Sequence, residues 1–495
     1  SAAGTGDLSI INGNVGTGGT FSACAMTGVC LPGGGTASVT QGATGNINLG
    51  TVTINIGGGL TISAGSTTGT ASIGTISAGG NIGINAGGNI TLNGAITGGG
   101  NVAITGTQLF LSSSMVLDAG TNLSLNADLG AVATPHAFDV TLSANNNVNI
   151  NNNIFLASNN LTLAADGDGN GFGNVEINGS TTESRTVLTQ GLLSVTGENF
   201  NINGADFGTT PSVRIGIATA LDVQANSINA TIGNQLNINA GQVFVGTSGA
   251  TGTRDVSVAV NATNDVNITA TGLSVQGGDI FASQSSYAGF VTARGNATLS
   301  AGNNITIAVS GNLSVKGGSA DGRASFYSSG SAKAFANASI SAGNNVNVTN
   351  VGGVMTVAAG PATALMTRVV EGTGSAVGQA NAKIDANNIT VTSAGSLNIS
   401  RGGATAQIDG FSSGSYSATA SANASLIATQ AINLNVIGDI NLNGTVSNIA
   451  SASVNSNDTG NYTVVANSNI LVKGGTDVTI TTTNGGLSIA GGSAS

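Results

Sequence analysis

Residues 300–307 read Ser-Ala-Gly-Asn-Asn-Ile-Thr-Ile, and residues 341–348 repeat them almost unchanged as Ser-Ala-Gly-Asn-Asn-Val-Asn-Val. In both copies a Gly-Asn-Asn corner precedes an apolar-polar-apolar triplet. Period-two alternation over so few residues indicates a short β-strand with one buried face, and Gly or Asn before the strand tolerates the positive φ of a sharp corner. The stretch therefore predicts short strands that are joined by tight corners.

The same unit recurs through the second half of the chain, with two anchors in each copy. The first anchor has spacings of 39, 41, 43 and 43 residues between Val266, Ile305, Val346, Ile389 and Ile432. The second has spacings of 40, 41, 43 and 43 residues between Leu273, Leu313, Val354, Leu397 and Ile440. Because the spacings of both anchors increase in the same way from copy to copy, they indicate internal repetition. We expect about two coils per repeat, because small-residue stretches such as 331–340 also alternate like strands.

The first half of the chain repeats at shorter intervals. Asn81, Asn101 and Asn122 each precede a triplet and are 20 and 21 residues apart, close to one turn of a parallel β-helix with three short strands. Stacked coils place identical positions above one another, so that Asn can hydrogen-bond to Asn and Ile can pack on Ile. We therefore predict an all-β parallel β-helix (β-solenoid), with an N-terminal segment over 1–45, irregular coils of about 20 residues over 46–250 and 39–46-residue repeats over 251–495.

The composition excludes several other classes of protein. Charged residues make up 6% of the chain, aromatic residues 3%, and Trp is absent, so a core of large side chains cannot form. A mean hydropathy of +0.26 argues against disorder. The net charge is -10 and the first positive side chain is Arg185, so we expect no nucleic acid partner. No apolar run reaches the roughly 20 residues of a membrane-spanning helix.

The two cysteines, Cys24 and Cys30, lie six positions apart near the N-terminus. We predict that they form a local disulfide, which favours an oxidising compartment and a secreted, extracellular or cell-surface location. A metal site with two thiolates is the alternative, but it would need further ligands. The one histidine, His136, is far away in sequence and follows Pro135, which is typical of a solvated loop.

The run Asp166-Gly167-Asp168-Gly169-Asn170-Gly171 matches the opening of a calcium-binding loop, in which alternating oxygen ligands surround a hard cation. On this pattern Asp166, Asp168 and Asn170 are candidate calcium ligands, and calcium is the one cofactor that the sequence suggests. The match ends there, because the twelfth position is Ile177 and Glu176 falls one residue early. An ordinary Gly-rich turn between coils is the alternative interpretation.

Parallel β-helices also include polysaccharide lyases and hydrolases, which need clustered carboxylates or a carboxylate beside a cation. Each candidate pair of neighbouring charges is typical of a solvated surface ion pair; the pairs are Glu183 with Arg185, Arg254 with Asp255, Asp321 with Arg323, Arg368 with Glu371, and Lys383 with Asp385. We therefore predict no catalytic residues and no enzyme. A Thr-rich run at 479–483 raises ice binding as a minor alternative.

The Ala-Gly-Gly-Asn-Ile runs at 78–82 and 86–90 and the Ala-Gly-Asn-Asn runs at 301–304 and 342–345 resemble the filamentous haemagglutinin-like exoproteins of bacterial two-partner secretion. This resemblance implies a right-handed parallel β-helix shaft with a role in surface display, adhesion or biofilm scaffolding, and it brings no catalytic residues. The Asn-Pro-Asn motifs typical of the secretion domain are missing from the sequence. That domain then lies upstream of Ser1, or export uses another route.

Neither end of the chain carries an obvious cap for the open strand edges of a solenoid. We therefore expect an extracellular structural or adhesive rod that assembles end to end through its terminal coils into surface filaments or biofilm matrix. The alternative is a monomeric adhesin shaft that binds a host surface or a polysaccharide. A β-helix lyase or hydrolase and an ice-binding solenoid are the weaker alternatives.

Overall fold

The computed structural model describes residues 8–9, 14–17, 21–22, 37–41, 44–49, 53–131, 133–205, 220–247, 252–367, 372–393, 395–410, 414–443, 450–456 and 461–490. All regular elements in these ranges are β-strands, and successive coils pair through parallel ladders. The predicted all-β parallel β-helix is confirmed. Within the same ranges, no helix has the length and hydropathy needed to cross a membrane.

The chain forms two compact units. Unit 1 comprises Ser1–Asn178, Thr186–Phe200 and Gln224–Gly233, and unit 2 comprises Gly179–Arg185, Asn201–Val223 and Asn234–Ser495. The segment boundaries proposed from the sequence at residues 45 and 250 stay a prediction.

The coils around Asn81 and Asn101 take about 20 residues, as the asparagine spacing predicts. Strands β10 (Ile82–Asn85), β11 (Ile90–Leu92) and β12 (Ile96–Gly98) make one such coil, and β13 (Val102–Leu111) and β14 (Met115–Ala119) make the next. The ladders place Ile82 beside Val102, Ile90 beside Leu109 and Ile96 beside Leu117. These side chains point inward and are at most 1% exposed. Burial of each contributes about 1.5–3 kcal/mol.

A ladder of asparagines stacks at one corner of unit 1. Asn101 N–H donates to Asn81 Oδ1 (2.8 Å), Asn122 Nδ2 to Asn101 Oδ1 (2.9 Å) and Asn147 Nδ2 to Asn122 Oδ1 (3.0 Å). The ladder continues through Asn174 and Asn199. Each asparagine thus provides a hydrogen-bond partner for a backbone N–H or an amide of the neighbouring coil. These bonds form at a corner, where the regular strand pairing stops.

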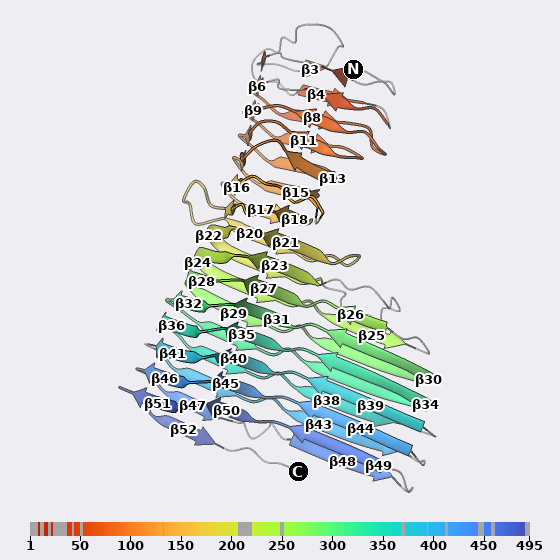
Figure 1. Cartoon of the computed structure of the whole chain (residues 1–495), viewed down its shortest axis with the longest axis vertical. Coiled ribbons are helices and arrows are strands. Elements are labelled where there is room, and N and C mark those ends of the chain that lie inside the picture. Colours follow the sequence, from red (N-terminus) through yellow and green to blue (C-terminus); the bar gives the residue numbers. More distant parts are fainter. Residues whose placement is uncertain are drawn as a thin grey trace. The chain divides into compact units, whose positions relative to one another are not determined.

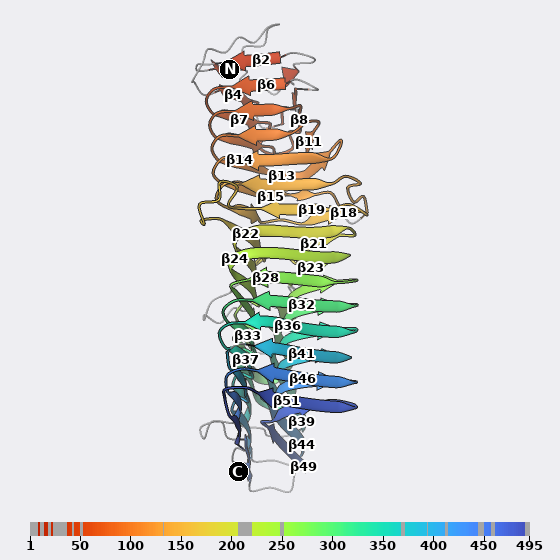
Figure 2. The ribbon, with the colours of Figure 1, turned by 90° about the vertical axis from the view of Figure 1, so that its left-hand side faces the viewer.

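The repeats of unit 2 also stack in register. Strands β28 (Val266–Ala270), β32 (Asn304–Val309), β36 (Asn345–Val351), β41 (Asn388–Ser393), β46 (Ala431–Val436) and β51 (Asp477–Thr482) lie side by side, as Figure 2 shows. The first anchor is confirmed, since its five residues occupy one buried column. The second anchor is wrong at one copy. Met355 takes the buried position between Leu313 and Leu397, and Val354 is 37% exposed.

Each repeat makes one coil, and the expectation of two coils is wrong. Strands β31 (Ala297–Ala301), β32 and β33 (Leu313–Lys316) complete one coil, and β35 (Ala338–Ala342), β36 and β37 (Met355–Ala358) complete the next. The residues between these coils form the long strand β34 (Ala320–Phe335), which belongs to a separate sheet. The small-residue stretch is a strand, as its alternation predicts, but it pairs with the equivalent strands of neighbouring repeats and not with strands of the coils.

We call this separate sheet the lamella (Figure 1). Its ten strands are β25 (Val243–Thr247), β26 (Gly252–Asp255), β30 (Ile280–Arg294), β34, β38 (Ala362–Thr367), β39 (Gly372–Gln379), β43 (Ala404–Gly410), β44 (Gly414–Ser421), β48 (Ala450–Ser456) and β49 (Asn461–Asn467). The first half of β34 pairs with β38 and its second half pairs with β39. Each repeat therefore runs outward in one layer and returns in a second.

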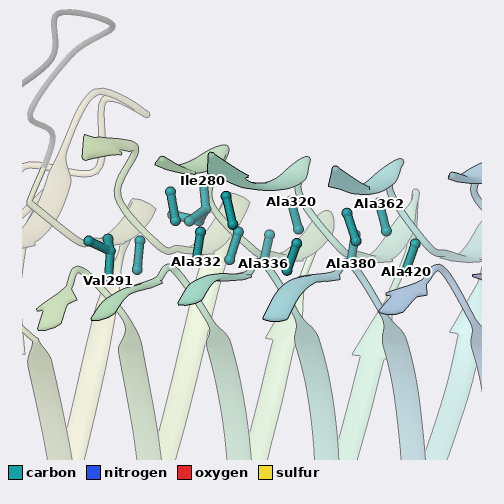
Figure 3. Packing of buried hydrophobic residues seen from close by; sticks show 14 of the residues in the cluster. Ile280, Val291, Ala320, Ala332, Ala336, Ala362, Ala380 and Ala420 are labelled. Atoms are coloured by element: carbon teal, nitrogen blue, oxygen red, sulfur yellow. The ribbon is translucent and has the colours of Figure 1, made fainter. Parts of the chain in front are cut away.

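Small side chains fill the space between the two layers. Ala320 and Ala362 of the outgoing layer face Ala332 and Ala380 of the returning layer (Figure 3), and all are at most 2% exposed. A Cβ atom at Gly322 would overlap the carbonyl oxygen of Val377 in the opposite layer. Around Gly322 the layers are therefore too close for a larger side chain, which accounts for the Gly and Ala residues there, whereas Ile280, Met366 and Tyr416 are buried elsewhere in the same cluster.

Enlarging a side chain inside the lamella should destabilise the fold. Ala332→Leu adds three carbon atoms at a fully buried position, and we expect a loss of about 1–3 kcal/mol from overpacking. Lys333→Leu changes the adjacent, outward-facing residue of the same strand and should have a much smaller effect. Guanidinium denaturation midpoints measure both, and equal shifts would contradict the close packing of the layers.

Breaking the asparagine ladder should also destabilise unit 1. Asn122→Ala removes an acceptor for the N–H and Nδ2 groups of Asn147 and a donor to Asn101, so we expect a loss of about 1–3 kcal/mol. Thr97→Ala, at an exposed position of β12, is the matched control. Thermal unfolding followed by circular dichroism compares the two variants, and an unchanged midpoint for Asn122→Ala would show that the ladder contributes little.

Candidate functional site

The Asp166 loop joins β19 (Leu161–Ala164) to β20 (Asn174–Asn178) in unit 1. Its backbone turns through positive φ angles of 62° at Asp166, 69° at Gly169 and 79° at Gly171. Two of these positions are glycines, which adopt such angles without a steric penalty, and the third is an aspartate, which tolerates them. The Gly-rich run thus forms a tight loop, as both interpretations of the sequence require.

The three candidate calcium ligands hydrogen-bond within the loop. Asp166 Oδ1 accepts from the N–H of Gly171 (3.1 Å), and Asp168 Oδ2 accepts from Asn170 Nδ2 (2.8 Å). The Oδ1 atom of Asn170 accepts from the N–H of Phe172 (2.8 Å). Calcium would need these oxygens to turn toward a common point. Among the described residues, no three His, Cys, Asp or Glu side chains are grouped closely enough to hold a metal ion. Calcium binding at Asp166, Asp168 and Asn170 stays a prediction.

Calorimetric titration of Ca²⁺ into the purified chain tests this prediction. The pattern requires saturable binding to the wild type and its loss in Asp168→Asn, because a carboxylate ligand is removed while the side-chain shape is kept. Asp385→Asn, on β40 (Ala382–Ala386) of unit 2, is the control for a nonspecific charge effect. Absence of binding by the wild type would reject the calcium loop in favour of the plain turn.

The predicted disulfide between Cys24 and Cys30 lies outside the described residues, and so does the pair Arg368 and Glu371. Two other pairs form ion pairs. Arg323 Nη2 lies 2.7 Å from Asp321 Oδ2, and Lys383 Nζ lies 3.3 Å from Asp385 Oδ1. The hydrogen bond to Asp321 raises the pKa of the Arg323 guanidinium, despite the opposing effect of burial. Both pairs remain partly exposed, as expected of surface ion pairs.

Two sequence-based expectations for single residues are wrong. His136 is 7% exposed rather than solvated, with Nε2 3.0 Å from the carbonyl oxygen of Leu109 and its ring edge-on to Phe110. Arg254 is 1% exposed, because it pairs with Ala293 in an inward-facing column of the lamella. The period of the sequence could have placed Arg254 inward, because Arg254 falls on the inward-facing positions of its own strand, which alternate with outward-facing ones.

The last described coil of unit 2 differs from the earlier described coils of that unit in the exposure of its inner columns. It consists of β50 (Ile470–Lys473), β51 and β52 (Leu487–Ala490). Val478 is 43% exposed although its column partner Ile432 is fully buried, and Ile489 is 70% exposed above Leu442, which is 9% exposed. The inner face of this coil bounds a hollow of about 480 Å³, lined in part by Val472, Ile480 and Ile489.

The backbone of this coil also has one free side. Strands β50, β51 and β52 pair with β45 (Ala424–Ala428), β46 and β47 (Ile440–Asn443). No described strand pairs with their other edge. The coil thus presents both apolar columns and a row of strand-edge N–H and C=O groups, which is the combination that accepts another parallel strand.

Comparison with protein-family models, with curated proteins and with solved structures finds no significant match for this chain. The resemblance to filamentous haemagglutinin-like exoproteins therefore stays an interpretation of the sequence pattern. The parallel β-solenoid itself rests on the strand pairing described above.

Proposed function

We propose that the chain is a non-catalytic structural solenoid of the cell surface or extracellular matrix, which self-assembles end to end. The observation that carries this proposal is the in-register stacking of similar coils, because the last described coil, residues 470–490, has the same apolar columns as the coil before it. Val478, Leu487 and Ile489 have column partners that are at most 9% exposed one coil earlier, yet they are 43–70% exposed themselves. Apolar side chains in this arrangement gain burial as soon as another coil stacks on them.

A second copy of the chain is the partner that fits this edge best. Each internal coil stacks on a coil of similar sequence, so the matching surface for an Ile/Val/Leu column is another coil of the same repeat. The first described strands, β1 (Leu8–Ser9), β2 (Asn14–Thr17) and β3 (Phe21–Ser22), belong to the proposed receiving coil. Such a head-to-tail contact does not close on itself and generates a filament.

The polar ladders support the same direction of assembly. In unit 2 the N–H of Asn423 donates to Asn381 Oδ1 and the N–H of Asn469 donates to Asn423 Oδ1, each at 2.9 Å. Asn469 is exposed, and its amide oxygen has the ladder position that accepts from a following coil. An added coil would therefore find hydrogen-bond acceptors as well as apolar columns in register.

Electron microscopy and sedimentation velocity of the purified chain over a range of concentrations test the proposal. We expect filaments with a regular axial repeat for the wild type. Ile489→Lys should remain as single chains, because stacking would bury an unpaired charge and weaken association by more than about a hundredfold. Thr390→Lys adds the same charge to an outward-facing position of β41 and should still assemble.

Two results would overturn the proposal. One is a wild type that stays as single chains at every concentration, and the other is an Ile489→Lys variant that assembles as well as Thr390→Lys. Because Ile489 is already largely exposed in the isolated chain, the substitution should leave the thermal midpoint nearly unchanged, which separates an assembly defect from a folding defect.

A further inference from the structure

A polar hollow lies beside the Asp166 loop in unit 1, far along the chain from the coil used for the assembly proposal. Its volume is about 330 Å³, at the lower end of the range of small-molecule sites, about 300–1,000 Å³. The side chains around it combine one aromatic ring, four amides and one carboxylate. They are Phe172, Asn146, Asn147, Asn174, Asn199 and Glu198.

Phe172 is the aromatic group at this hollow. Its side chain is 74% exposed, the highest exposure among the large apolar residues of the described chain. The loop around it otherwise consists of Gly, Asp and Asn. Hydrogen bonds hold the backbone on both sides of the ring. The N–H of Phe172 donates to Asn170 Oδ1, and the carbonyl oxygen of Gly173 accepts from the N–H of Glu198 (2.7 Å). Phe172 is thus an exposed ring on a braced backbone.

The amides at the hollow are also held in place. Asn147 Oδ1 accepts from the N–H of Asn174 (3.1 Å), and Asn174 Oδ1 accepts from Asn199 Nδ2 (2.8 Å). An asparagine amide has two donor hydrogens and two acceptor lone pairs, so Asn147 and Asn174 keep hydrogen-bonding capacity beyond these ladder bonds. Because the ladder fixes their positions, a ligand does not have to order them on binding.

The charge around the hollow selects the class of ligand. Glu198, Asp166 and Asp168 are carboxylates, and residues 1–184 contain no Lys or Arg. An anionic ligand would meet repulsion without a compensating cation. An uncharged ligand with one apolar face and several hydroxyl groups fits instead, since the ring of Phe172 suits the C–H face while amides and a carboxylate exchange hydrogen bonds with the hydroxyls.

We propose that this hollow binds an uncharged glycan, with Phe172 as the stacking platform and Asn147, Asn174 and Glu198 as hydroxyl partners. The proposal does not depend on self-assembly. It adds a recognition site to a chain whose other described features are structural, and places this site on the side of a coil, where it would be available in a single chain and in a filament alike.

A printed array of neutral and acidic glycans, probed with the full chain, tests the proposal. We expect binding to neutral glycans, and about tenfold weaker binding by Phe172→Ala in a calorimetric titration with the strongest neutral oligosaccharide from the array. Phe172→Tyr keeps the aromatic face and should retain binding. Phe290→Ala removes another exposed phenylalanine, 55% exposed on β30 of the lamella, and should bind like the wild type.

Three outcomes would overturn the proposal: no binding to any neutral glycan, binding to acidic glycans alone, or equal affinity of the wild type and Phe172→Ala. None of them bears on filament formation, which Ile489→Lys tests separately. Since Phe172 contacts solvent over most of its surface, its replacement should not disturb the fold.

Discussion

In-register stacking of equivalent residues is the constraint on which this structure depends. A parallel solenoid places each residue directly above its counterpart in the previous coil, so that one side chain must be compatible with a copy of itself at the strand spacing of about 4.8 Å. Ile, Val and Leu meet this requirement in the interior, and Asn meets it at the corners by donating to one neighbour and accepting from the other. Charged residues do not meet it, which explains a charged content of 6%.

The lamella applies the same constraint with a thinner interior. The two layers of strands approach so closely at Gly322 and Gly378 that glycine is required there, and most of the buried residues between the layers are alanines. Each alanine buries little area, but the strands of β30 and β34 are 15 and 16 residues long, so many small contacts and a continuous backbone ladder add up. A chain with only 3% aromatic residues can therefore still bury a continuous cluster between two layers of strands.

The sequence predicts the strand type, the buried columns and the repeat, because alternation and spacing follow directly from strand geometry. It does not predict which strands belong to the coils and which to the lamella. Residues 331–340 alternate in the same way whether they belong to a coil or to the lamella, and so one coil per repeat was not foreseen. The period predicts Val354 at the buried position of this copy, whereas the register shift after Val348 in β36 places Met355 there instead. The exposure of Phe172 depends on the local turn, which the period does not describe either.

The repeats of unit 2 differ in length mainly in the segments between their coils. Strands β31, β35, β40 and β45 all have five residues, whereas the segment between one coil and the next grows from 20 residues at 277–296 to 26 at 444–469. Most of the length difference between repeats is therefore taken up by the segments that form the lamella. A gene encoding such repeats can gain or lose codons in the lamella segments without changing the register between coils. The sequence of the lamella is therefore free to diverge while each coil still stacks on the next.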